Sequence, residues 1–143
     1  MSVKAPVAVI IPTYNRGTAV VSVLERVFAC NPQPAEIWVH VDQSDGVLER
    51  QLSERFPDVR ILSSTSRLGP GGGRHRCLLA CGPPYAVSLD DDSFPLDADF
   101  FATVGRLFSE NPGAGILGAQ VQHRGEPTNP RTDTLRRLSL IHI

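Results

Sequence analysis

Short, continuous apolar runs alternate along this chain with longer segments in which apolar residues recur every three or four positions. The first run, residues 7–11, reads Val-Ala-Val-Ile-Ile and stops at Pro12. Such a run is typical of a strand covered on both faces, whereas the recurring spacing predicts amphipathic helices. Parallel strands need crossover helices between them, so the alternation predicts an α/β domain with a mainly parallel sheet flanked by helices.

Proline, glycine and asparagine residues mark the ends of these segments. Strands are expected at residues 7–11, 37–41, 59–62, 85–89 and 115–122. Helices are expected at residues 17–31, 47–56, 74–81 and 95–111. The apolar stripe of the first helix is Val20, Val23, Leu24, Val27 and Phe28, and that of the last is Phe100, Val104, Leu107 and Phe108. The glycine-rich stretch Gly69–Gly73 is expected to be a loop before the third helix.

The bulk composition limits the classes of protein and partner. The chain has 143 residues, 41% hydrophobic and 20% charged, which fits one globular domain. Its net charge of −1 gives no general attraction to nucleic acid or to an anionic membrane. The run at 7–11 is too short for a signal peptide, and no stretch is long enough to span a bilayer. We therefore expect a cytoplasmic protein, either free or at the cytoplasmic face of a membrane, with no nucleic-acid partner.

The cysteines predict neither a disulfide framework nor a soft-metal site. Cys30, Cys77 and Cys81 are odd in number and have no secretory context. His75, Cys77 and Cys81 could be read as ligands of a soft metal. The favoured interpretation is that the two cysteines are small apolar residues on one helix face.

Three consecutive aspartates, Asp90, Asp91 and Asp92, follow the apolar run 85–89 directly. Two like unit charges about 4 Å apart repel by roughly 4 kcal/mol at an effective dielectric constant of 20, so a cation is needed to offset the cluster. Mg²⁺ and Mn²⁺ prefer carboxylate oxygens and are commonly shared with a substrate phosphate. The cluster predicts a metal–phosphate site at the end of a strand. The alternative is a solvated acidic turn that caps the following helix.

Polar residues follow three of the expected strands, at residues 12–16, 42–45 and 90–92. Ligands of parallel α/β sheets bind beyond the carboxyl ends of the strands, so this coincidence favours a real site. Asp42 could accept hydrogen bonds from a base or a ribose, or it could be a turn residue. Tyr14 could stack on a ring or pack over the edge of the sheet.

The glycine-rich stretch does not match the common phosphate-binding motifs. A P-loop needs Gly-Lys-Ser/Thr where Gly73-Arg74-His75 stands, and Arg74 occupies the third glycine position of a dinucleotide fingerprint. The stretch could be a flexible loop that approaches a ligand or a plain surface loop. If Arg74 begins a helix, it opposes the helix dipole, which either an anionic ligand or solvation would relieve.

Taken together, residues 7–16, 41–46, 71–75 and 89–93 resemble the corresponding motifs of the family 2 glycosyltransferases, which have the Rossmann-like GT-A fold. The resemblance covers residues 5–125. In that family the first loop and the acidic residue after the second strand hold the nucleotide, the arginine after the glycine stretch lies near the base, and the aspartates bind ribose and a divalent metal. It implies nucleotide-sugar binding by Pro12, Thr13, Tyr14, Arg16, Asp42, Arg74, Asp90 and Asp91, and metal binding by Asp90 and Asp92.

The chain departs from the family pattern in three places. His75 stands where the family often has Asn, and residues 42–45 replace an Asp-Asp-Gly-Ser type of turn. The family's acceptor-binding half and general base lie well beyond the aspartates, whereas this chain stops at Ile143. We therefore expect residues 1–125 to be the N-terminal, donor-binding part of a GT-A domain. Residues 126–143 are expected to be an incomplete tail, with a truncated or mis-joined end and no catalytic base.

The resemblance implies a glycosyltransferase that depends on Mg²⁺ or Mn²⁺ and transfers a sugar with inversion. The donor is a nucleotide sugar, and the acceptor, whether saccharide, lipid or protein, is unknown. Two alternatives stay open. One is a fragment that binds nucleotide sugar without turnover. The other is a Mg²⁺-dependent phosphotransfer enzyme with Asp90 and Asp92 as nucleophile and acid, although the supporting Lys and Ser/Thr motif is missing. The 143-residue chain itself is expected to bind donor weakly and to transfer no sugar.

Overall fold

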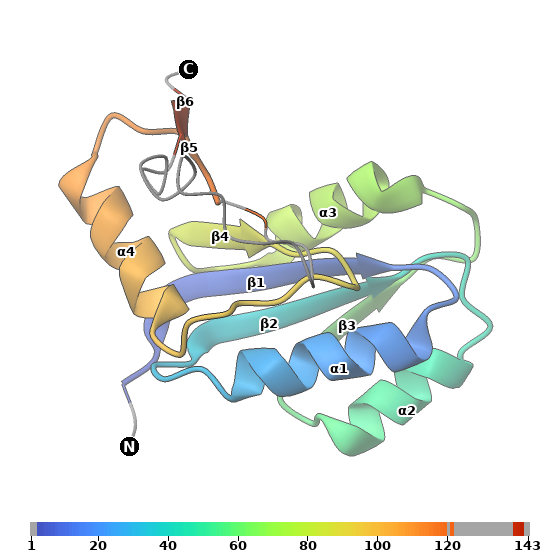
Figure 1. Ribbon diagram of the computed structural model, residues 1–143. Helices are drawn as coiled ribbons and strands as arrows, with labels where there is room; N and C mark the ends of the chain where they lie inside the picture. The colour runs from blue at the N-terminus through green and yellow to red at the C-terminus, as the bar shows by residue number, and fades with distance from the viewer. Residues whose placement is uncertain (1–2, 120, 122–138, 142–143) are drawn as a thin grey trace. The chain divides into compact units, whose positions relative to one another are not determined.

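The computed structural model describes residues 3–119, 121 and 139–141. The chain forms two compact units, residues 1–105 and 106–143, and helix α4 (Phe100–Glu110) runs from the first into the second. The first unit contains a four-stranded sheet with helices on both faces (Figure 1). The predicted α/β class is therefore confirmed.

The four strands of this sheet are all parallel and follow the order β3-β2-β1-β4. Their bounds are β1 (Ala5–Thr13), β2 (Pro34–Val41), β3 (Arg60–Ser63) and β4 (Tyr85–Ser88). In the interior strand β1, Ile10 is in register with Trp38 of β2 and Ser88 of β4. Every residue of β1 except Pro6 is buried, as expected for an apolar run covered on both faces.

Helices α1 (Gly17–Phe28) and α2 (Val47–Arg55) lie on one face of the sheet, and α3 (Gly69–Ala80) lies on the other (Figure 1). The predicted stripe of α1 is confirmed, because Val20, Val23, Leu24 and Val27 are buried and Phe28 is partly buried. The ring of Phe28 also stacks on that of Phe56, with centroids 5.6 Å apart. Each fully buried side chain of this kind contributes about 1.5–3 kcal/mol, so the stripe fixes α1 on the sheet.

The predicted stripe of α4 omitted the residue that packs most tightly. Phe101 is fully buried in the core of the first unit, whereas Phe100 and Val104 are only partly buried. The rings of Phe100 and Phe101 meet edge to face, with centroids 5.3 Å apart. Adjacent aromatic residues at the start of a helix can both reach the core, which a strict three- and four-residue spacing does not predict.

The second unit contains the end of α4 and a two-stranded antiparallel sheet. β5 (Ile116–Gly118) pairs with β6 (Ser139–Ile141), and Ile116 is in register with Ile141. The strand expected at residues 115–122 is confirmed over 116–118, and residues 120 and 122 lie outside the described part. Most of the tail expected at residues 126–143 also lies outside it, so that expectation stays a prediction.

The glycine-rich stretch forms the first turns of α3, so the predicted loop is wrong. Pro70 is in the first turn of this helix, where backbone N–H groups have no partner within the helix, so the missing N–H of proline costs no hydrogen bond. A Cβ atom on Gly73 would lie only 2.8 Å from Nδ1 of His40 and 3.2 Å from Cβ of Pro12. Glycine therefore lets α3 approach β1 and β2 closely, which outweighs its low helix propensity. Arg74 lies inside the helix rather than at its start, so the expected conflict with the helix dipole is also wrong.

His40 lies on β2 directly under this close contact. Its side chain is completely buried, and neither ring nitrogen has a hydrogen-bond partner among the described residues. Burial lowers the pKa of His40 below its ordinary value of about 6.5, although the nearby Asp42 partly opposes that change and Arg76 adds to it. The native state therefore contains a neutral imidazole, and protonating it would weaken the contact between α3 and the sheet.

We predict that the free energy of unfolding falls as pH drops below about 6.5, by up to roughly 1.4 kcal/mol per pH unit from this one group. The sign follows because the unfolded chain binds a proton on His40 that the folded chain excludes. Denaturant unfolding between pH 7.5 and 5 should show a smaller fall for His40→Leu than for the wild type. The exposed His75, changed to Leu, is the control and should keep the wild-type slope. Equal slopes for all three proteins would contradict the prediction.

Candidate functional site

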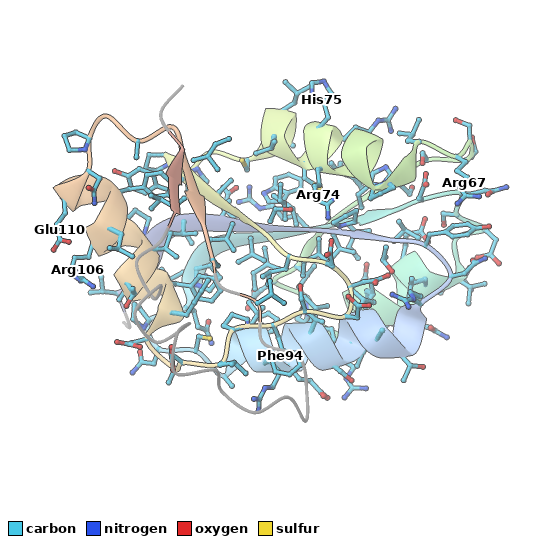
Figure 2. The ribbon with its side chains drawn as sticks, turned by 45° about the horizontal axis from the view of Figure 1, so that its top comes forward. Arg67, Arg74, His75, Phe94, Arg106 and Glu110 are labelled. Carbon is cyan, nitrogen blue, oxygen red and sulfur yellow. The ribbon has the colours of Figure 1, made fainter. Side chains whose placement is uncertain are left out.

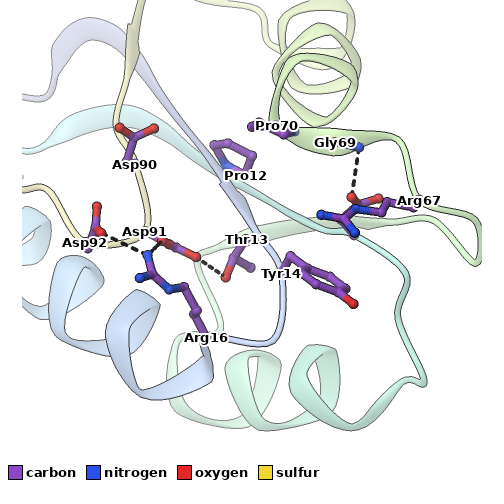
Figure 3. A pocket seen from close by; sticks show the side chains of 11 residues that line it. Pro12, Thr13, Tyr14, Arg16, Arg67, Gly69, Pro70, Asp90, Asp91 and Asp92 are labelled. Carbon is purple, nitrogen blue, oxygen red and sulfur yellow. Dashed lines mark hydrogen bonds and ion pairs between the residues drawn. The ribbon is translucent and has the colours of Figure 1, made fainter.

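The carboxyl ends of β1, β2 and β4 meet at a cavity of about 410 Å³. Its lining residues come from these strand ends and the loops that follow them, from the segment before α3, and from the start of α3 (Figure 3). They are Pro12, Thr13, Tyr14, Arg16, Asp42, Arg67, Gly69, Pro70, Asp90, Asp91 and Asp92. The three polar segments singled out in the sequence are therefore brought together. Of the predicted site residues, only Arg74 is not part of this lining.

Asp91 connects the end of β4 to the end of β1. Its carboxylate is buried and accepts hydrogen bonds from Thr13 Oγ1 at 2.9 Å and from Arg16 Nη1 at 3.0 Å (Figure 3). The same Arg16 nitrogen also lies 2.9 Å from Oδ2 of Asp92. The hydrogen bond to Asp91, and to a smaller extent the one to Asp92, raises the pKa of the Arg16 guanidinium above its ordinary value. One arginine thus pairs with two neighbouring carboxylates and offsets one of their two negative charges.

Asp90 has a different arginine partner. Arg74 donates a hydrogen bond from Nε to Ser88 Oγ at 2.8 Å and forms an ion pair with the exposed Asp90 carboxylate. Figure 2 shows Arg74 pointing from α3 toward the sheet, whereas its neighbour His75 points away. The contact of Arg74 with a nucleobase stays a prediction. What the structure places next to Arg74 is the end of β4.

Asp42 holds the segment that leads into α3. Its buried carboxylate accepts hydrogen bonds from Ser64 Oγ at 3.0 Å and from the backbone N–H groups of Leu68 at 2.8 Å and Gly69 at 2.9 Å. Burial alone would raise the pKa of Asp42, but hydrogen bonds from Leu68, Ser64 and Gly69 outweigh it and lower the pKa. A carboxylate can accept about four hydrogen bonds, so Oδ2, which accepts one, keeps room for a ligand donor.

Tyr14 and Arg67 form the other part of the lining. Tyr14 is 37% exposed, and the Arg67 guanidinium lies 4.9 Å from the centroid of its ring. The cavity therefore has an aromatic ring and a cation near Asp42 and carboxylates near the end of β4. Arg67 was missed in the sequence, because it lies in an irregular segment whose position depends on the hydrogen bonds of Asp42. No local pattern marks it.

The residues fit a divalent ion only in combination with other oxygen donors. Within the described part of the chain, no group of three or more His, Cys, Asp or Glu side chains could hold a metal ion. On α3 Cys77 is buried, Cys81 directly after the helix is partly buried, and burial raises the pKa of Cys77 to about 11. Asp90 and Asp92 supply two exposed carboxylates. Mg²⁺ commonly binds one or two carboxylates together with substrate phosphates and water, and that incomplete donor set is what these residues offer.

Comparison with known proteins decides the family. The sequence profile of glycosyl transferase family 2 matches residues 8–141. The chain belongs to that family. This match confirms the resemblance that was drawn from the strand-end motifs. No curated protein sequence matches this family 2 chain closely enough to count as a relative.

Solved structures show the same GT-A fold. A mannosyltransferase, PcManGT from Pyrobaculum calidifontis in complex with GDP-Man and Mn²⁺, superposes with a TM-score of 0.70 at 22% identity. The match covers 85% of this chain and 36% of that enzyme. TarS 1–349 of S. aureus in complex with UDP-GlcNAc superposes with a TM-score of 0.69 at 17% identity, over 89% of this chain and 37% of that 1–349 segment. The family 2 chain thus spans little more than a third of PcManGT and of TarS 1–349, and 23% of the longer TarS structure.

Fold likeness by itself does not give the reaction. A 4-diphosphocytidyl-2C-methyl-D-erythritol synthase also superposes, with a TM-score of 0.51 at 12% identity over 90% of this chain. Membership of family 2 rests on the sequence match rather than on this shared architecture. In the part of the chain that the structure describes, no helix has the length and apolar character needed to cross a membrane.

The two neighbouring carboxylates should differ sharply in their contribution to stability. Asp91→Ala leaves Thr13 and Arg16 without a buried acceptor, and we predict a loss of about 2 kcal/mol in the free energy of unfolding. Asp92→Ala removes only an exposed ion pair and should cost less than about 0.5 kcal/mol. Urea denaturation at pH 7.5 measures both. Equal losses would show that the Thr13–Asp91 contact does not stabilise the fold.

Proposed function

We propose that this chain is the donor-binding part of a metal-dependent, inverting glycosyltransferase. The observation that carries the proposal is the cavity where three strand ends converge in a member of family 2. Its lining offers an aromatic ring and a hydrogen-bonding carboxylate at β1 and β2, and two exposed carboxylates at the end of β4. A nucleoside diphosphate needs those two kinds of contact at its two ends.

The base end of the donor would lie against Tyr14. An exposed aromatic ring stacks on a nucleobase, and Arg67 above the ring adds a cation that hydrogen-bonds base or ribose oxygens. Asp42 would accept a hydrogen bond through Oδ2, the oxygen with remaining capacity. In the free protein Asp42 also positions Arg67 and Gly69, so its role would combine ligand contact and loop anchoring.

The diphosphate end would lie against the aspartates. Asp90 and Asp92 are the residues that would hold Mg²⁺ or Mn²⁺, which would neutralise the leaving diphosphate as a Lewis acid. Arg16 and Arg74 lie next to these carboxylates and offer guanidinium groups suited to phosphate oxygens. Buried Asp91 would keep Arg16 and Thr13 in place.

Sugar transfer itself would need further groups. Inversion follows when a base removes the proton of an acceptor hydroxyl while that oxygen attacks the anomeric carbon. We assign no residue of this chain as the catalytic base, and we name no acceptor. The GDP-Man complex of PcManGT and the UDP-GlcNAc complex of TarS support a sugar nucleotide as the donor class.

Two other functions are less well supported. A fragment that binds nucleotide sugar without turnover would have the same cavity. This alternative is supported by the chain's spanning 36% of PcManGT and 37% of TarS 1–349. A phosphotransfer enzyme would need Asp90 as a nucleophile. That carboxylate is ion-paired with Arg74, and no lysine is among the residues that line the described cavity.

The metal part of the proposal is tested at Asp92. Asp92→Asn should weaken Mn²⁺-dependent binding of a nucleotide sugar by about tenfold or more, because one of two ligand carboxylates is lost. Asp45→Asn is the matched control, since Asp45 is an exposed carboxylate whose oxygen accepts a hydrogen bond from Val47 N–H and does not line the main cavity. Titration calorimetry with a panel of nucleotide sugars, with and without Mn²⁺, gives both affinities. Small and equal effects would leave the aspartates as an acidic turn.

The proposed stacking of the nucleobase is tested at Tyr14. Tyr14→Ala should lower the affinity for a nucleoside diphosphate about fivefold or more, since stacking of a base on an aromatic ring contributes about 1–3 kcal/mol. Affinity for inorganic pyrophosphate, which has no base, should stay unchanged and serves as the control ligand. If both affinities fell together, Tyr14 would be acting on the fold of the site rather than on the base.

A further inference from the structure

Arg16 occupies the place where a cation is needed in this site. Its Nη1 atom lies between two successive carboxylates, 3.0 Å from Oδ1 of Asp91 and 2.9 Å from Oδ2 of Asp92 (Figure 3). Clustered carboxylates repel each other unless a positive charge lies between them. In the free protein this charge comes from the chain itself, at the first residue before α1.

The two halves of this bridge are unequal. The Asp91 side chain is 11% exposed and has Thr13 as a second partner, so its contact with Arg16 is partly buried. The Asp92 side chain is 58% exposed and the Arg16 side chain 56% exposed. An exposed ion pair is weak, whereas a partly buried one is harder to break. The Arg16–Asp92 contact is therefore the half that a ligand could open.

From this asymmetry we infer that Arg16 is an internal counter-ion that a divalent metal must displace from Asp92, so that metal and diphosphate bind together rather than one after the other. The inference rests on the proposed function and adds to it a coupling between metal binding and diphosphate binding. A metal ion alone meets a carboxylate that is already ion-paired and a guanidinium that repels it. A diphosphate offers the guanidinium new oxygens, with the paired geometry that arginine favours. Arg16 then keeps Asp91 and exchanges Asp92 for phosphate.

A consequence is mutual dependence of the two ligands. If diphosphate draws Arg16 off Asp92, it raises the affinity for metal, and metal must raise the affinity for diphosphate by the same factor. Arg16 is thus a positioning residue for the metal ligand Asp92. Its removal should make metal binding easier in the absence of nucleotide and reduce the gain that nucleotide brings.

The experiment measures Mn²⁺ binding by water-proton relaxation, with the full 143-residue chain, in the absence and presence of a nucleoside diphosphate. Arg16→Gln removes the charge but keeps donors for Asp91. It should bind Mn²⁺ alone about threefold more tightly than the wild type, the scale of one exposed ion pair. The gain in Mn²⁺ affinity on adding the diphosphate should shrink by a similar factor.

Arg55→Gln is the matched control. Its side chain is also 56% exposed and ion-paired, to Glu25, and it changes the net charge equally at a place outside the cavity lining. It should leave both Mn²⁺ affinities at their wild-type values. Circular dichroism confirms that each variant is folded.

The possible results separate this inference from the proposed function. If Arg16→Gln binds Mn²⁺ alone no more tightly than the wild type does, the counter-ion role is overturned. The same holds if neither protein binds Mn²⁺ alone. An equal gain in the Arg55 variant would also overturn it, because net charge would then be the cause. If no diphosphate or nucleotide sugar binds to any variant, the proposed function fails. A tighter Mn²⁺ affinity in Arg16→Gln alone would still support the competition at Asp92.

Discussion

The carboxylate of Asp42 connects three parts of the fold through one buried group. Asp42 directly follows β2. Its carboxylate accepts hydrogen bonds from the hydroxyl of Ser64 after β3 and from the N–H groups of Leu68 and Gly69 at the start of α3. Hydrogen bonds to a buried charge contribute about 1.5–3 kcal/mol each, and an unpaired buried carboxylate would cost more. The positions of Arg67 and of the first turn of α3, and hence one wall of the cavity, follow from this residue.

A second constraint is the balance of charge at the end of β4. Three adjacent carboxylates would oppose folding if they stood alone, yet each has a basic partner in this structure: Arg16 for Asp91 and Asp92, and Arg74 for Asp90. The acidic cluster can thus form before any ligand arrives. The same arginines are suited to phosphate oxygens, so the groups that make the free site stable are also those that a diphosphate would engage.

The sequence predicts best where a single physical pattern decides the structure. Residues 7–11 must be a buried strand because nothing in them is polar, and the stripe of α1 allows only one face toward the sheet. It predicts poorly where tertiary contact overrides a local preference. Position 73 of α3 is a glycine because a side chain there would clash with His40, a residue far away in sequence. Arg67 belongs to the lining for the same kind of reason, since distant hydrogen bonds place its segment.

The order of the strands gives the proposed donor site its direction. Because the sheet runs β3-β2-β1-β4, Asp42 at the end of β2 and the aspartates after β4 lie on opposite sides of β1. Tyr14, in the loop after β1, lies toward the first, whereas Thr13 at the end of β1 and Arg16 in that loop lie toward the second. A nucleoside diphosphate placed across the end of β1 would then have its base beside β2 and its phosphates beside β4. The loop after β1 would contact both ends of the ligand, with Tyr14 at the nucleobase and Arg16 at the diphosphate, so that a change at either residue should affect one end, as should a change at Asp42 or Asp92.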